Sequence, residues 1–164
     1  MKLLYFIITI LIVLTGILIY TIIMLKKHIK KIENMSSRYS IYYKLLSQWL
    51  KNKAQNMKIT DYLMKNGIKT VAIYDIGEVG QLLYEELKGE QVQVSYLIES
   101  VGGNAIEGRY GKKVVGIKEI VFQENVDAII VTPVYNFVDI YNSLIDENVE
   151  SIILSLEDII YGQK

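Results

Sequence analysis

Residues 69–100 change their hydrophobic pattern twice within a short stretch of chain. An apolar run at 71–74 is typical of a buried strand, and it leads directly into the sequence DIGEVG at residues 75–80. From Val79 the apolar residues recur at helical spacing, and Gly89 ends that pattern. Alternating apolar residues over 92–98 predict a second strand, which Glu99 follows. A chain with this order must place a tight glycine turn between a strand and a helix.

The turn has two of the three glycines that a dinucleotide-binding turn contains. Gly77 permits close approach of a ligand to the backbone, and Gly80 lets the helix pack tightly on the strand, but Asp75 stands where the first glycine is expected. Such a turn places N–H groups and a helix N-terminus against a phosphate. Asp75 and Glu78 bring negative charge there, and each pair of like charges at about 4 Å costs roughly 4 kcal/mol at an effective dielectric near 20. A nucleotide-binding turn and a structural turn without a ligand therefore both stay open.

The remainder of the chain continues to alternate strands with helices. Strands are predicted at 113–115, 127–131 and 151–154, and helical segments at 61–66, 118–122, 137–145 and 155–158, with Thr60 as the N-cap of the first and Gly67 as its end. The glycine-rich stretch 101–116 is predicted to be mostly loop. This alternation predicts an α/β fold, a small Rossmann-like parallel sheet with flanking helices over 68–164.

Residues 3–25 carry no charge. Twenty-three residues at about 1.5 Å each span roughly 34 Å, enough to cross a bilayer. A secretory signal peptide does not fit, because the run is too long and no small-residue cleavage site follows it. Four lysines follow at 26, 27, 30 and 31, so the positive-inside rule places the C-terminal domain in the cytoplasm. The sequence predicts a single-pass transmembrane anchor over 1–25 in the cytoplasmic membrane.

The segment 26–67 is basic and largely helical in pattern. Its apolar face follows alternating steps of three and four residues through Ile29, Ile32, Ser36, Tyr39, Tyr43, Leu46 and Leu50. This spacing fits a parallel homodimeric coiled coil over 29–50, and it also fits a helix docked on its own domain, with Trp49 extending the apolar face.

Charge is distributed unevenly along the chain. Residues 1–67 carry eleven Lys/Arg against two Asp/Glu, whereas residues 68–164 carry seven against sixteen. The basic part would be attracted to anionic lipid headgroups. The acidic part excludes nucleic acid as a partner, because phosphate contacts supply most of that affinity.

No residue is predicted to be catalytic or to bind a metal. Tyr84 and Lys88 have the spacing of the acid/base pair of short-chain dehydrogenases, but they lie on the helix straight after the first strand, where that pair does not belong. His28 is the only histidine of a chain without cysteine, so it has no Cys or His partner with which to bind a metal. An enzyme, such as a truncated epimerase or dehydratase, is therefore the least favoured interpretation.

Three motifs together carry a resemblance to a known family: GEVG followed by LLYEEL, the DAIIVTP strand, and the closing IILSLEDIIYG. Over roughly residues 45–164 the chain resembles the small Rossmann domain of bacterial cell-surface polysaccharide proteins, such as the one that precedes the catalytic part of CapD-like nucleoside-diphosphate-sugar epimerase/dehydratases. The resemblance implies a non-catalytic module for a nucleotide or nucleotide-sugar, with NAD(P) as an alternative ligand, near membrane enzymes of polysaccharide synthesis.

The ligand-binding residues that follow from the turn and from this resemblance are few. Glu99 lies 22 residues beyond Gly77, a suitable distance for an acid that holds a ribose diol. The resemblance places Thr132 and Pro133 at a strand end beside the cleft. The predicted binding residues are Asp75, Ile76, Gly77, Glu78, Val79, Gly80, Glu99, Thr132 and Pro133. The alternative is a Rossmann-like domain that has lost its ligand and docks onto a membrane enzyme.

Overall fold

The computed structural model describes residues 1–99 and 110–163, without the side chains of residues 3, 4, 8, 9, 12 and 13. Most of the predicted loop over 101–116 therefore lies outside the described residues. The described chain forms two compact units, Met1–Tyr42 and Tyr43–Lys164.

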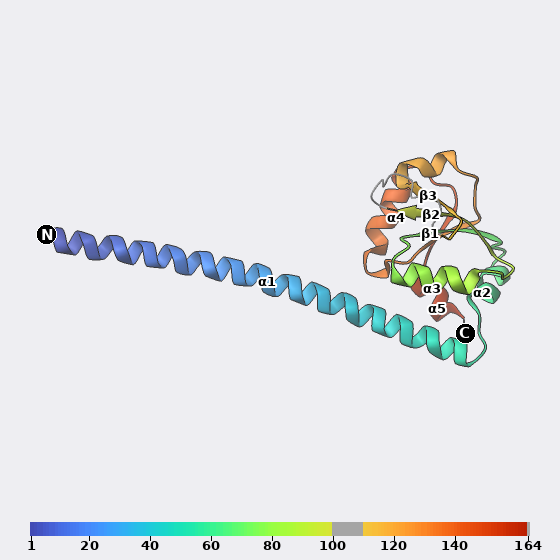
Figure 1. The fold of residues 1–164 in the computed structure, drawn as a ribbon, viewed down its shortest axis with the longest axis horizontal. Coiled ribbons are helices and arrows are strands. Elements are labelled where there is room, and N and C mark those ends of the chain that lie inside the picture. The colour runs from blue at the N-terminus through green and yellow to red at the C-terminus, as the bar shows by residue number, and fades with distance from the viewer. Residues whose placement is uncertain (100–109, 164) are drawn as a thin grey trace. The chain divides into compact units, whose positions relative to one another are not determined.

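The second unit is built on one parallel sheet of five strands (Figure 1). The strands run in the order β3-β2-β1-β4-β5, and all neighbours are parallel. Their bounds are β1 Thr70–Tyr74, β2 Gln93–Glu99, β3 Lys113–Gly116, β4 Ala128–Val131 and β5 Ile152–Ser155. This arrangement confirms the predicted α/β, Rossmann-like parallel sheet.

Helices cover both faces of the sheet. Their bounds are α2 Ile59–Lys65, α3 Glu78–Leu87, η1 Ile117–Phe122, η2 Val134–Asn136, α4 Phe137–Asp146 and α5 Leu156–Gly162, with η1 and η2 of the tighter 3₁₀ type. Alternate residues of β1 and β4, among them Tyr74 and Val131, pack against Ile140 and Leu144 of α4. α3 contacts β1 and β2, and α2 packs on both α3 and α5. Figure 1 shows α2, α3 and α5 gathered together, with α4 apart from them.

The last turns of α1, a helix over Lys2–Ala54, belong to the second unit. Leu45, Trp49 and Asn52 are almost fully buried. The Trp49 indole donates a hydrogen bond to Glu86 of α3 at 2.8 Å, and the Asn52 amide donates to the Ile160 carbonyl at 2.6 Å. Over these residues the helix is docked on its own domain, as one of the two open predictions had it.

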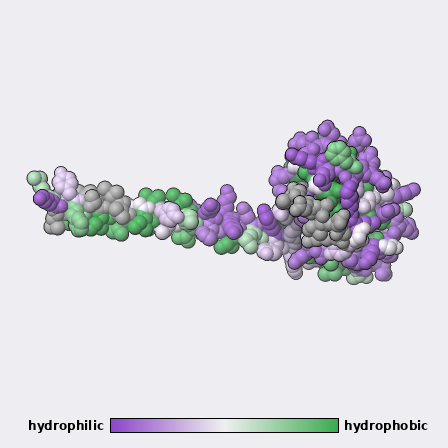
Figure 2. Space-filling view, turned by 45° about the horizontal axis from the view of Figure 1, so that its top comes forward, coloured by the Kyte–Doolittle hydropathy of each residue, from purple (hydrophilic) through white to green (hydrophobic). Residues whose placement is uncertain are grey.

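The first unit consists of the remainder of α1. Figure 2 shows hydrophobic surface along the N-terminal part of this helix and hydrophilic surface further along it. Among the described residues, which leave out six side chains within the apolar run, we find no helix long and apolar enough to cross a membrane. The structure thus gives the predicted anchor over 1–25 no support, and the anchor stays a prediction from the sequence.

The predicted N-cap at Thr60 is wrong. Lys58 occupies the cap position, and Thr60 lies inside α2, where its hydroxyl is buried and has no hydrogen-bond partner. The Glu86 carboxylate accepts the Ile59 N–H at 3.3 Å. A side chain from a distant helix thus takes the role that the sequence pattern assigned to a local hydroxyl.

Candidate functional site

The turn after β1 is formed around Asp75. Its backbone is in the left-handed region, with φ at +67°. Glycine adopts this conformation freely, and Asp is among the few other residues that tolerate it. The Asp75 carboxylate accepts the Gly77 N–H at 3.0 Å, which closes a local side-chain turn. Asp75 therefore keeps the backbone conformation that the expected glycine would have.

Gly80 brings the first turn of α3 against the end of β1. A Cβ atom at this position would lie 2.2 Å from the Asp75 carbonyl oxygen, far inside any tolerated contact. At Gly77 a Cβ would meet only the Asp75 carboxylate, at 3.3 Å, and Gly77 itself is exposed. The two glycines thus have the two roles that the sequence predicted, close helix packing at Gly80 and an open backbone at Gly77.

Thr132 connects this turn to β4. Its hydroxyl lies 2.8 Å from the Asp75 carbonyl and 3.0 Å from the Tyr74 carbonyl, and its side chain is almost fully buried. In this strand order the chain leaves β1 toward β2 on one side and places β4 on the other, so the carboxyl ends of β1 and β4 form the switch point of the sheet. Ligands of open α/β sheets bind outside such a point.

Glu99 ends β2 directly beside the turn. Ile98 pairs with Tyr74, the last residue of β1, and its carbonyl accepts the Asp75 N–H at 2.9 Å. Glu99 is the next residue after Ile98. Glu78 is exposed at the first position of α3. The structure therefore gathers three carboxylates, from Asp75, Glu78 and Glu99, at the carboxyl ends of β1 and β2.

The other predicted residues have lesser roles. Ile76 is fully buried, Pro133 is buried, and Val79 is half-buried, so these three residues shape the turn and offer little surface to a ligand. The N–H groups of residues 78–80 precede the first regular hydrogen bond of α3, in which the Gln81 N–H donates to the Gly77 carbonyl at 2.9 Å. Donors at this position are the ones that a helix N-terminus offers to an anion.

The basic residues nearest in sequence do not complete this site. Lys113 begins β3 beside Tyr96, three residues before Glu99, and its ammonium donates to Gln123 at 2.8 Å. Lys112 lines a hollow at the end of α3 and the start of β2. Arg109 lies outside the described residues.

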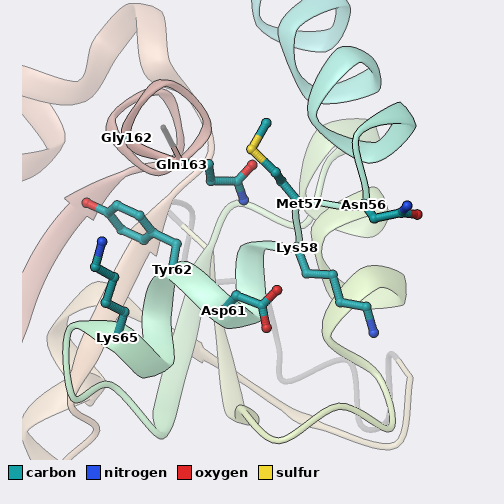
Figure 3. A pocket seen from close by; sticks show the side chains of 8 residues that line it. All are labelled: Asn56, Met57, Lys58, Asp61, Tyr62, Lys65, Gly162 and Gln163. Carbon is teal, nitrogen blue, oxygen red and sulfur yellow. The ribbon is translucent and has the colours of Figure 1, made fainter.

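A pocket of about 200 Å³ lies elsewhere in the second unit (Figure 3). Tyr62 of α2 lies across the end of α5, so close that a Cβ atom on Gly162 would be 2.7 Å from its ring. The lining residues are Asn56, Met57, Lys58, Asp61, Tyr62, Lys65, Gly162 and Gln163, and none of them is a predicted binding residue. The pocket and the turn are thus separate places.

Two carboxylates that sequence reasoning missed hold the domain together. Glu86 is one, and its contacts are described above. The Asp127 carboxylate accepts the Lys69 and Thr70 N–H groups, each at 2.8 Å, and these hydrogen bonds lower the pKa of Asp127 below its ordinary value of 3.8. Asp127 precedes β4, so it ties the start of that strand to the start of β1. Only the pairing of β1 with β4 reveals this role.

Comparison with known proteins adds no assignment, because neither the family models nor the curated proteins give a match to this chain.

Proposed function

We propose that the second unit is a non-catalytic Rossmann-like module that binds a nucleotide or nucleotide-sugar at the carboxyl edge of its sheet. One observation carries the proposal: Gly80 presses the start of α3 onto the Asp75 carbonyl at the switch point between β1 and β4. This close approach directs the N–H groups of the first turn of α3 to the place where such folds hold a phosphate.

The surrounding charges favour a particular way of binding. Glu99 stands at the end of the neighbouring strand, where an acid accepts hydrogen bonds from a ribose diol. The Asp75 and Glu78 carboxylates repel negative charge on the ligand. We therefore expect the sugar of the ligand to contact Glu99. We also expect the ligand to carry the smallest phosphate charge found among nucleotides and nucleotide-sugars.

We also propose where in the cell this module acts. The uncharged residues 3–25 would anchor it at the cytoplasmic membrane, with the second unit in the cytoplasm. The family resemblance at 45–164 supports a place beside membrane enzymes of cell-surface polysaccharide synthesis. NAD(P) is also to be tested, because a turn of this kind is common to domains that bind dinucleotides and to domains that bind nucleotide-sugars.

The experiment is a thermal-melting series on the full chain in mild detergent, with NAD, NADH, NADP, ADP, coenzyme A and several UDP- and GDP-sugars. The single tryptophan, Trp49, is buried in the second unit and reports its unfolding. A ligand at 100 times its dissociation constant stabilises the fold by about 2.7 kcal/mol, which raises the melting temperature by several degrees. Gly77→Val should abolish that shift, because its side chain would cover the backbone that faces the phosphate.

A second candidate rests on the hydrogen bond between the Asp75 carboxylate and the Gly77 N–H. The carboxylate takes a donor that a phosphate would otherwise use, which favours a ligand-free domain that docks onto a membrane enzyme. If this candidate holds, the wild-type chain shows no shift at millimolar ligand. Asp75→Gly, which frees the donor and removes the charge, would then create binding.

A further inference from the structure

One side of α4 carries a row of exposed apolar side chains. Val138, Tyr141 and Ile145 repeat at steps of three and four residues, so they follow one another along the helix, and we call them the α4 row. Their exposed fractions are 67%, 40% and 47%. Ile140 and Leu144, on another side of α4, make its contact with the core. The packing of α4 on its own domain therefore leaves much of the row uncovered.

Tyr141 lies in the middle of the α4 row. Its ring contacts the ring of Phe137, one turn earlier, with the two centroids 5.9 Å apart. Tyrosine is enriched among the residues that carry most of the binding energy of protein interfaces. An aromatic ring between two aliphatic side chains at helical spacing is suited to contact the apolar stripe of another helix.

The charges around the α4 row have one sign. Residues 119–163 contain nine Asp/Glu and no Lys or Arg. Asp139 and Asp146 border the row on α4 itself, and both are exposed. Neither carboxylate makes an ion pair with any residue that the structure describes. The surface thus combines apolar side chains with negative charge that the domain leaves uncompensated.

This charge decides what kind of occupant fits. A second copy that placed its own α4 row here would bring another acidic border with it, and like charges repel. An anionic lipid surface is disfavoured for the same reason. The complementary occupant is an amphipathic helix with lysines or arginines beside its apolar stripe.

We propose that the α4 row docks a Lys/Arg-rich amphipathic helix that adjoins a membrane span of a partner membrane protein. Membrane proteins concentrate Lys and Arg in the segments that flank their spans on the cytoplasmic side. The choice of a membrane protein rests on the cytoplasmic setting proposed above, which vesicle flotation tests separately. The cationic character of the partner rests on the α4 row and its border, and the contact needs no ligand at the turn.

Two adjacent residues of α4 test this contact, because the chain has no cysteine of its own. Asn142 lies within one turn of Val138 and Ile145, whereas Ser143 lies on the side away from the row, and both are exposed. The full chain in mild detergent, as Asn142→Cys or Ser143→Cys, is converted to its mixed disulfide with thionitrobenzoate. The probe is an amphipathic helical peptide of leucine and lysine with one cysteine, whose thiolate displaces the coloured thionitrobenzoate. Capture should be about tenfold faster at Asn142→Cys, because docking raises the effective concentration of the thiol there.

Loss of the row should remove this preference. We expect Val138→Ser combined with Ile145→Ser to slow capture at Asn142→Cys to the rate at Ser143→Cys. The matched control is Val121→Ser combined with Phe122→Ser, which removes two apolar side chains of η1 that are 53% and 82% exposed and should leave the preference intact. A twin probe with glutamate in place of lysine should show no preference. Equal capture of the lysine probe at both cysteines, or a preference that survives loss of the row, overturns the proposal.

Sedimentation of the cysteine-free full chain tests the other occupant, a second copy. We expect Val138→Ser combined with Ile145→Ser to leave the sedimentation unchanged. A wild-type chain that self-associates and comes apart in this variant would assign the row to a second copy and overturn the choice of a different protein.

Discussion

At the scale of single residues, the departure of Asp75 from the glycine pattern preserves the turn. The positive φ of Asp75 and its hydrogen bond to Gly77 reproduce the conformation for which glycine is usual. Gly80 has no such freedom, because the Asp75 carbonyl occupies the space of any side chain there. The substitution therefore changes the charge of the site far more than its backbone geometry.

Gly80→Ala should destabilise the second unit by about 3 kcal/mol, the cost of overpacking at a site where only backbone can give way. Gly77→Ala is the matched control, since its Cβ would meet only a movable carboxylate at 3.3 Å. Urea denaturation followed by Trp49 fluorescence measures both. A Gly80→Ala variant as stable as Gly77→Ala would show that α3 does not approach β1 so closely.

Asp127 makes the stability of the domain depend on pH. Its pKa is lowered in the folded chain by the hydrogen bonds from Lys69 and Thr70, so its contribution is fully present above the unfolded pKa of about 3.9 and is lost as the pH falls through the folded value. Asp127→Asn should therefore melt below the wild type at pH 6, and the gap should shrink as the pH falls below about 4. The control is Asp146→Asn, at an exposed carboxylate on α4. A gap that is constant with pH would contradict the lowered pKa.

At the scale of elements, the helices are joined through Glu86. Its carboxylate receives the Trp49 indole N–H and the Lys53 ammonium, at 2.8 and 2.9 Å, and the Ile59 N–H at 3.3 Å, while only 9% of its side chain is exposed. One side chain of α3 thus holds the end of α1 and the start of α2.

Glu86→Ala should cost about 2 kcal/mol of unfolding free energy, because it leaves a buried indole donor and a helix start unsatisfied. Its neighbour Glu85 is half exposed and lies 3.8 Å from the Lys88 ammonium, so Glu85→Ala should change stability by less than about 0.5 kcal/mol. Chemical denaturation measures the free energy of unfolding of both variants. Equal effects would mean that the contacts of Glu86 add nothing.

The sequence predicts these elements well wherever their pattern is local. The strands, α3, α4 and the end of α2 at Gly67 follow from hydrophobic period and glycine position, and the structure confirms them. Thr60 failed as a cap because Glu86, distant in sequence, occupies that role. At the candidate site the sequence located the turn and Glu99, but the side-chain turn at Asp75 and the Asp127 tie depend on the fold.

At the scale of the whole molecule, we propose a ligand module joined to a membrane anchor, and the anchor is predicted from the sequence alone. The full chain should stay with lipid vesicles through high-salt and alkaline washes, because residues 3–25 would lie in the hydrocarbon. A variant that lacks residues 1–25 keeps the lysines of α1 that follow the apolar run, so salt should release it from anionic vesicles. Vesicle flotation measures both chains, and a full chain that salt alone releases would contradict the anchor.

We propose that the turn of residues 75–80 holds the ligand. Amide hydrogen exchange of the full chain, with and without each nucleotide and nucleotide-sugar, tests it directly because it locates where protection appears. We predict slower exchange at residues 77–81 and around Glu99, with no change around Tyr62 and Gly162. Protection confined to the pocket beside Tyr62, or no protection with any of these ligands at millimolar concentration, would contradict ligand binding at the turn.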